Sequence, residues 1–186
     1  MSTETPDKEI LALFANKKTQ YKSFELLTLK YQKKIYWQVR RMVKDHEDAD
    51  DLVQEVFIKI WKNLEKFRED AQLSTWIYRI AVNETLKFIK KKQRLQTVDF
   101  DDVKHSISEK LYATNDFSGD HIQKTLQAAI DTLPTKQKLV FNLKYFEELK
   151  YDEISEMVGT SVGALKTSYH IAVKKIEKFV KDSLNQ

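Results

Sequence analysis

The sequence predicts an all-α protein of two small helical domains joined by a flexible linker. Glycine and proline, the commonest turn residues, occur only three times and twice in 186 residues. Apolar residues recur at intervals of three and four, the spacing of helices that bury one face. Residues 96–120 lose this spacing and collect aspartate, serine and asparagine. We therefore expect helical domains over residues 1–95 and 121–186 that move independently of each other.

The composition limits the class of protein and its partners. Hydrophobic residues make up 41% and charged residues 32%, a balance typical of folded domains. The absence of cysteine excludes disulfides and thiolate metal sites. The sequence shows neither a signal peptide nor an apolar run of about 18 residues, so we expect a cytoplasmic protein without membrane insertion. The net charge of +4 and the clustered lysines indicate a polyanionic partner.

In the first domain, one helix is expected on each side of the acidic segment KDHEDADD. The preceding helix has one apolar stripe, formed by Phe24, Leu27, Tyr31, Ile35, Val39 and Met42. The acidic residues favour the start of the next helix, because carboxylates cap free backbone N–H groups and complement the helix dipole. A divalent-metal site is the weaker interpretation, since no glycine shapes a calcium loop and the carboxylates are adjacent rather than alternating.

The segment STWIYRIAVNETLKFIKKKQR, residues 74–94, is predicted to be a helix with apolar residues on two sides, wedged between two neighbours. The remaining strip of its surface contains Trp76, Arg79, Asn83, Lys87, Lys90 and Arg94. Lysine and arginine suit a phosphate backbone, asparagine can pair with a base edge, and tryptophan can stack on an unpaired base. The alternative is that Trp76 is a core residue and the lysines only solvate a surface helix.

The second domain contains the pattern of a helix-turn-helix. Residues 151–158 form a short predicted helix, Gly159 suits its left-handed end, and Ser161 suits the N-cap of the next helix. The second helix leaves a face that could enter a major groove, formed by Ala164, Lys166, Thr167, Ser168, His170, Ile171 and Lys174. An ordinary helical hairpin is the alternative. His170 has no second ligand at metal spacing, so we expect it to be a polar surface residue.

Two separate motif sets resemble the bacterial extracytoplasmic-function (ECF) sigma factors of RNA polymerase, in the sigma-70 family. DADDLVQEVFIKIWKNLEKF resembles sigma region two where it docks on the polymerase clamp helices. LSTWIYRIAVNETLKFIKKK resembles the adjoining segment that reads and melts the minus-ten promoter element. LPTKQKLVFNLKYFEELKYDEISEMVGTSVGALKTSYHIAVKKI resembles region four, which reads the minus-thirty-five element. The resemblance extends from Phe24 to Phe179 and keeps the motifs in order.

The resemblance implies three sets of contact residues. Contacts to core polymerase are implied for Asp51, Gln54, Glu55 and Ile58. Contacts to the minus-ten strand are implied for Trp76, Arg79, Asn83 and Lys87, with Lys90 and Arg94 continuing the cationic strip and residues 65–73 cupping an extruded base. Contacts to the minus-thirty-five duplex are implied for Lys166, Thr167, Ser168 and His170, with Lys174 on the same outward face. Ser168 and Ile171 stand where many relatives carry arginine, so fewer bidentate guanine contacts are expected.

The expected activity is binding rather than bond chemistry. The sequence shows no nucleophile and base set, glycine-rich phosphate loop or metal cluster, so we expect no enzyme activity, no metal and no cofactor. The predicted partners are core RNA polymerase and promoter DNA, both duplex and melted, and an anti-sigma factor is a further candidate. Two alternatives stay open: a helix-turn-helix regulator not bound to polymerase core, and a structural helical adaptor. Neither explains the strip along residues 76–94.

Overall fold

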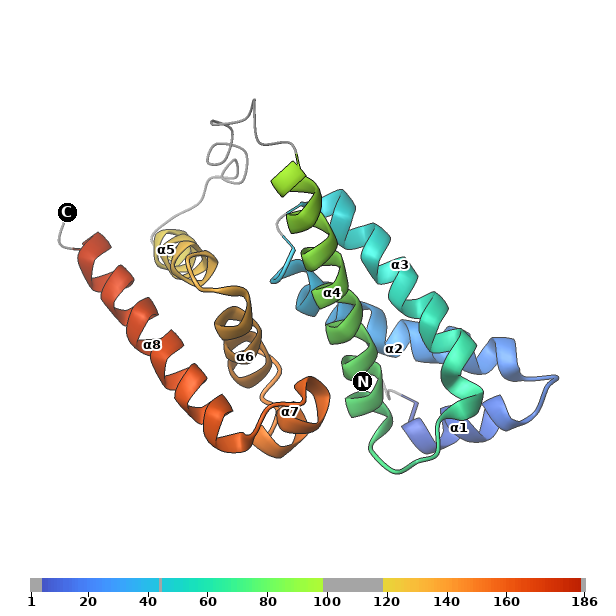
Figure 1. Cartoon of the computed structure of the whole chain (residues 1–186). Coiled ribbons are helices and arrows are strands. Elements are labelled where there is room, and N and C mark those ends of the chain that lie inside the picture. The colour runs from blue at the N-terminus through green and yellow to red at the C-terminus, as the bar shows by residue number, and fades with distance from the viewer. Residues whose placement is uncertain (1–4, 44, 99–118, 185–186) are drawn as a thin grey trace.

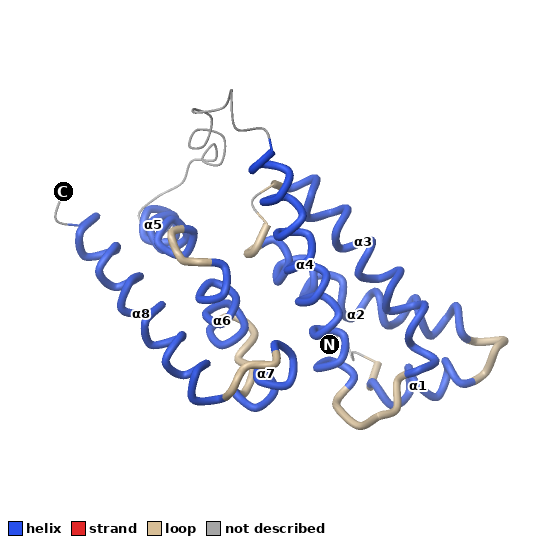
Figure 2. The backbone as a smooth tube through the Cα atoms, in the orientation of Figure 1, coloured by secondary structure: helices blue, strands red, loops and turns tan. Residues whose placement is uncertain are grey.

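The computed structural model describes residues 5–43, 45–98 and 119–184, and every regular element in these ranges is helical. The elements are α1 (Asp7–Ala15), α2 (Gln20–Arg40), α3 (His46–Asn63), the short 3₁₀ helix η1 (Leu64–Lys66), α4 (Leu73–Val98), α5 (Gly119–Asp131), α6 (Thr135–Tyr145), α7 (Tyr151–Val158) and α8 (Val162–Leu184). Figure 1 shows two helical groups, α1–α4 and α5–α8, and Figure 2 shows the loops that join the helices within each group. The all-α prediction is confirmed. The expected flexible linker falls mainly on residues 99–118, outside the described part of the chain.

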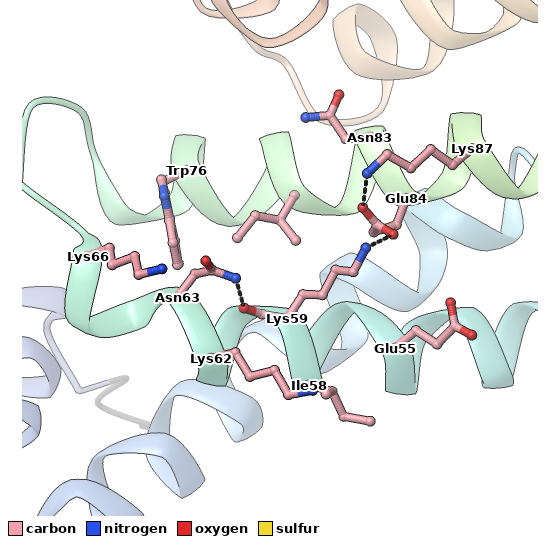
Figure 3. Close-up of a pocket in the computed structure, with 11 residues that line it drawn as sticks. Glu55, Ile58, Lys59, Lys62, Asn63, Lys66, Trp76, Asn83, Glu84 and Lys87 are labelled. Carbon is pink, nitrogen blue, oxygen red and sulfur yellow. Dashed lines mark hydrogen bonds and ion pairs between the residues drawn. The ribbon is translucent and has the colours of Figure 1, made fainter.

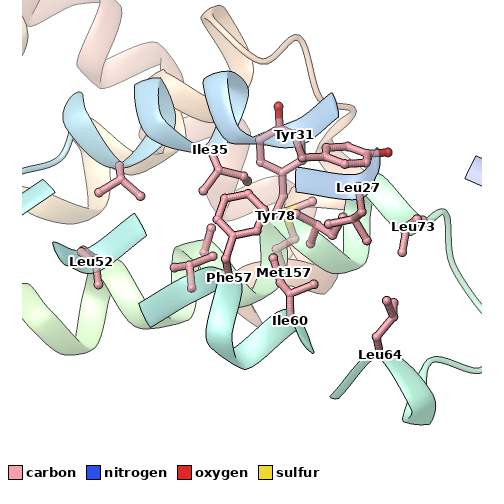
Figure 4. Packing of buried hydrophobic residues seen from close by; sticks show 14 of the residues in the cluster. Leu27, Tyr31, Ile35, Leu52, Phe57, Ile60, Leu64, Leu73, Tyr78 and Met157 are labelled. Atoms are coloured by element: carbon pink, nitrogen blue, oxygen red, sulfur yellow. The ribbon is translucent and has the colours of Figure 1, made fainter. Parts of the chain in front are cut away.

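The first group is a bundle with one hydrophobic core (Figure 4). Buried side chains from all four helices meet in it, including Ile10, Phe14, Leu27, Tyr31, Ile35, Val39, Leu52, Val56, Phe57, Ile60, Ile77 and Ala81. The acidic segment starts α3 as predicted, because Asp45 Oδ1 accepts a hydrogen bond from the Asp48 amide at 3.0 Å. This hydrogen bond lowers the pKa of the Asp45 carboxyl, since it favours the charged form.

The second group has its own core, in which residues of α5, α6 and α8 pack around Phe141. Gly159 ends α7 with a left-handed φ of 64°, and its N–H donates to the Ser155 carbonyl at 2.9 Å. At the start of α8, Ser161 Oγ accepts a hydrogen bond from the Ala164 amide at 3.4 Å. Both helix ends of the helix-turn-helix are therefore formed by the residues that the sequence predicts.

The two groups pack against each other along α4. A shared hydrophobic cluster joins Met42 and Val82 of the first group to Leu139, Val140, Leu143, Ile154 and Leu165 of the second. Met157 of α7 is 4% exposed and packs in the core of the first group (Figure 4). The prediction that α4 is buried on two sides is confirmed, and its second neighbour is the α5–α8 group. The two groups are therefore docked through shared apolar surface in this structure, and their independent movement stays a prediction.

Polar contacts cross the same interface. Glu147, in the turn after α6, accepts hydrogen bonds from Arg41 Nη1 at 2.6 Å and from Tyr78 Oη at 2.7 Å. The Arg41 guanidinium lies 4.1 Å from the ring centroid of Phe146, in a cation–π contact. Burial and the neighbouring Glu147 carboxylate both raise the pKa of Tyr78 well above its usual value, because both disfavour a phenolate. The interface therefore combines apolar packing with oriented charges.

Candidate nucleic-acid interface

A groove of about 800 Å³ lies between α3 and α4 (Figure 3). Its walls contain Glu55, Ile58, Lys59, Lys62, Asn63, Lys66, Trp76, Ile80, Asn83, Glu84 and Lys87. The residues from each helix follow mostly at intervals of three and four, so one face of α3 opposes one face of α4. The groove therefore collects a tryptophan ring, two side-chain amides and four ammonium groups in one hollow.

The four lysines make the groove cationic although two carboxylates, those of Glu55 and Glu84, also lie in its walls. Lys87 Nζ lies 3.0 Å from Glu84 Oε1, and Lys59 pairs with the other oxygen of the same carboxylate (Figure 3). Burial raises the pKa of Glu84, but the hydrogen bonds from Lys59 and Lys87 outweigh it and lower the pKa below its usual value. Glu84 is therefore charged at neutral pH and holds a lysine from each wall.

Trp76 lies at the end of the groove nearest the loop between α3 and α4 (Figure 3). Its ring is half-buried, and its centroid is 5.3 Å from that of Phe67 at an interplanar angle of 51°. Trp76 packs against the core of the bundle and also lines the groove. Trp76 is therefore partly a core residue, and its stacking on an unpaired base stays a prediction for the part that lines the groove.

The acidic helix α3 also presents an exposed face formed by Asp51, Gln54, Glu55 and Ile58, of which Glu55 and Ile58 line the groove as well. Their spacing of three and four places them together on one side of the helix. Ile58 is 52% exposed among these polar side chains. This face suits a protein contact in which carboxylates attract a basic partner and the apolar side chain becomes covered.

Helix α8 lies on the side of its group remote from α4 (Figure 1), and it has a separate exposed polar face. Its exposed members are Lys166, Thr167, His170 and Lys174, and Ser168 is half-buried. Thr167 Oγ1 donates a hydrogen bond to the Gly163 carbonyl at 3.1 Å, and Lys166 Nζ lies 5.9 Å from the Tyr151 ring centroid. As the second helix of the helix-turn-helix, α8 has the position from which such motifs enter a major groove.

Comparisons with known proteins decide the family. The family model for Sigma-70 region 2 matches residues 27–95, and that for Sigma-70, region 4 matches residues 123–176. The RNA polymerase sigma-H factor of Pseudomonas aeruginosa is 30% identical over 173 residues, which are 89% of this chain and 90% of that protein. The chain belongs to the sigma-70 family. It is also 31% identical over 160 residues to the ECF RNA polymerase sigma factor SigW of Bacillus subtilis, covering 82% of this chain and 86% of that protein. It is an ECF-type sigma factor, a transcription initiation factor and not an enzyme.

Solved structures share the fold of this sigma factor. The sigma factor RpoE of Bartonella quintana, in complex with the anti-sigma factor NepR, has a TM-score of 0.71 at 19% identity and covers 86% of this chain and 98% of its own. CnrH, in complex with the cytosolic domain of CnrY, has a TM-score of 0.66 at 18% identity and covers 95% and 97%. No helix in the described ranges is long and apolar enough to cross a membrane. Below, region two denotes α1–α4 and region four denotes α5–α8.

The structure divides the predicted minus-ten strip of this sigma factor. The groove contains its members Trp76, Asn83 and Lys87. Lys90 and Arg94 are exposed further along α4, beyond the groove. Arg79 instead faces region four, where its Nη2 lies 3.4 Å from Glu156 Oε2. Arg79 is about 60° from Trp76 around the helix, at the edge of the strip, and this edge meets α7.

Sequence reasoning missed several residues of the groove, namely Lys59, Lys62, Asn63 and Glu84, whereas Lys66 lies within residues 65–73, which the resemblance places around an extruded base. The resemblance assigns α3 to polymerase contacts alone, although Lys59 and Lys62 share one face of this helix and could have indicated a second, anionic partner. The ion pair between Lys59 and Glu84 has no comparable local signal, because the two residues are 25 positions apart.

Proposed function

We propose that this sigma factor binds core RNA polymerase through the α3 face of Asp51, Gln54, Glu55 and Ile58. The groove between α3 and α4 captures the melted minus-ten strand. The α8 face of Lys166, Thr167, Ser168, His170 and Lys174 reads the minus-thirty-five duplex. The protein acts in the cytoplasm, where core polymerase and promoter DNA are found.

The groove is the observation that carries the minus-ten role. Asn83 can pair with a free base edge, Trp76 offers a ring for stacking, and lysines on both walls suit the phosphates beside them. Stacking contributes about 1–3 kcal/mol per base. Capture of an extruded base would therefore offset the unpairing cost of a few kcal/mol.

The proposed function requires region two and region four to separate on the promoter. The minus-ten and minus-thirty-five elements are about 25 base pairs apart, or roughly 85 Å at about 3.4 Å per pair. A compact chain of this length has a radius of gyration of about 16 Å, and so a diameter of roughly 40 Å. The docked arrangement therefore cannot span both elements. Docked and separated forms therefore belong to different steps of initiation.

Two alanine variants test the division of labour between the DNA sites, on a promoter selected by run-off transcription from a genomic library. Asn83→Ala should spare duplex binding and reduce permanganate-reactive thymines at the start site. A pre-melted minus-ten bubble should restore open complexes only to the extent that the lost energy was spent on opening, and the variant should still bind the bubble more weakly than the native chain. Lys166→Ala should weaken duplex binding by about 1–3 kcal/mol if it reads a base edge, and leave opening intact once the complex forms. The proposal is wrong if both variants lose duplex binding equally and the bubble rescues neither.

An anti-sigma factor is the further partner that we propose. RpoE, which shares the fold, was solved in complex with the anti-sigma factor NepR. Copurification from the native cell should recover core polymerase with this sigma factor during active transcription, and a sigma-binding protein without core polymerase when the sigma factor is held inactive.

A further inference from the structure

Glu84 is a buried carboxylate in a groove that otherwise suits a polyanion. It is 8% exposed, whereas the side chains of its partners Lys59 and Lys87 are 42% and 70% exposed. A buried charge is costly unless it is paired, and a carboxylate repels phosphate. Glu84 therefore acts on the two lysines and not on the phosphates of a bound polyanion.

The geometry shows that Glu84 holds the two lysines in place. Lys59 comes from α3 and Lys87 from α4, and each binds a different oxygen of the Glu84 carboxylate (Figure 3). Lysine side chains have about 2 kcal/mol of rotamer entropy and sample many positions when unrestrained. Glu84 restricts both ammonium groups to the same part of the groove, whose lining also includes Asn83, the preceding residue of α4.

We propose that Glu84 is a positioning residue for minus-ten capture: it holds the ammonium groups of Lys59, from α3, and Lys87, from α4, together in the groove so that they meet the phosphates beside the base that Asn83 reads. Glu84 itself does not contact DNA. The role rests on the proposed function of the groove. In this role the Glu84 carboxylate orients the cationic side chains of the site, as supporting residues orient catalytic or binding groups in other sites.

The sign of one substitution separates this role from simple charge effects. Glu84→Gln adds one unit of positive charge, so Coulomb attraction alone predicts tighter DNA binding and a steeper salt dependence. The positioning role predicts the opposite, because the two lysines lose the group that directs them. A purely structural role of Glu84 predicts a loss that does not depend on the lysines.

The experiment measures the affinity of the holoenzyme for the selected promoter with a pre-melted minus-ten bubble, over a series of salt concentrations. Glu84→Gln should weaken binding about tenfold, equivalent to one charge-assisted hydrogen bond. It should also reduce the salt slope by about 1.4, since each single-strand phosphate contact contributes about 0.7. Glu25→Gln is the matched control: it removes a carboxylate that pairs with Lys22 on the exposed surface of α2, and binding should not change.

Glu84→Asp keeps the proposal falsifiable if Glu84→Gln folds poorly, and a background without the two lysines adds a second test. Glu84→Asp retains the charge but shortens the side chain, so it should also weaken binding, whereas charge alone predicts no change. In a chain that carries Lys59→Met and Lys87→Met, Glu84→Gln should no longer weaken binding, because the groups that it positions are gone. An equal loss in that background, or tighter binding by Glu84→Gln in the native background, would overturn the proposal.

The result also distinguishes failure of this role from failure of the groove function. If Asn83→Ala weakens binding to the bubble but Glu84→Gln strengthens it, the groove binds the strand and only the positioning role is wrong. If neither Asn83→Ala nor Glu84→Gln changes affinity for the bubble, the groove does not bind the minus-ten strand and both proposals fail.

Discussion

Glu147→Gln should shift this sigma factor from the docked towards the separated form. Glu147 is the common acceptor for Arg41 and Tyr78, the two region-two donors that reach it across the interface. Glutamine keeps the size of the side chain but removes the charge. The contact with Tyr78 then becomes a neutral hydrogen bond, and Arg41 loses its counter-ion. The apolar cluster around Val82 remains.

The magnitude follows from the burial of the pair. A hydrogen bond to a charged group contributes about 1.5–3 kcal/mol. The side chains of Arg41 and Glu147 are 23% and 10% exposed, so water replaces part of the lost contact to Arg41. After this discount the substitution should cost about 2 kcal/mol of docking free energy. The equilibrium between docked and separated forms then moves about thirtyfold.

Single-molecule energy transfer can measure this shift, because the chain has no cysteine and an engineered pair is labelled specifically. Lys33→Cys on α2 and Lys178→Cys on α8 replace exposed side chains, one in each region. The native chain should show one high-efficiency population, and Glu147→Gln should add a low-efficiency population. Glu148→Gln removes the same charge from an exposed neighbouring position and should leave the distribution unchanged. Native-like efficiency in Glu147→Gln, or an equal shift in Glu148→Gln, would refute the reasoning.

Other predictions concern pH, polymerase binding and stability. The docked state raises the pKa of Tyr78. The contribution of Tyr78 to docking is therefore fully present below the ordinary pKa near 10 and is lost as the pH rises towards the docked-state pKa. The same dye pair should show this loss in the native chain, and Tyr78→Phe is the control. The double variant Asp51→Lys, Glu55→Lys should no longer pull down core polymerase, because the reversed charges would repel basic clamp residues. Its helicity, measured by circular dichroism, should not change. Retained binding would contradict the polymerase role of α3. Ile60→Ala, at a fully buried position, should lower the free energy of unfolding by about 2–5 kcal/mol in urea denaturation, whereas exposed Ile58→Ala should cost less than about 0.5 kcal/mol. Equal costs would show that the assigned core is wrong.

The helices were predictable because their apolar spacing is local information. The stripe through Leu27, Tyr31 and Ile35 faces the bundle core as its intervals of three and four indicate. The helix-turn-helix was equally readable, since Gly159 supplies a left-handed helix end and Ser161 an N-cap. Each of these features depends on neighbours within one or two turns of the chain.

The docking of region four was not predictable in the same way. The second apolar side of α4, which includes Val82, indicates that another element covers it, but the spacing does not identify that element as region four. Arg79 shows the consequence: it belongs to the cationic strip by its position on the helix, yet it pairs with Glu156 of α7, 77 residues away. The lysines of α3 and the buried Glu84 likewise acquire their relation only when α3 and α4 are packed together.

The most direct test of the groove function is photo-crosslinking from Lys62, which lies in the α3 wall of the groove and is exposed. A benzophenone amino acid at this position in the holoenzyme should crosslink to a single strand within the minus-ten element of the open promoter complex. It should crosslink much less in the closed complex, where the bases are still paired. Crosslinks confined to polymerase, or equal on closed and open promoter, would contradict the account that the groove between α3 and α4 holds the melted strand.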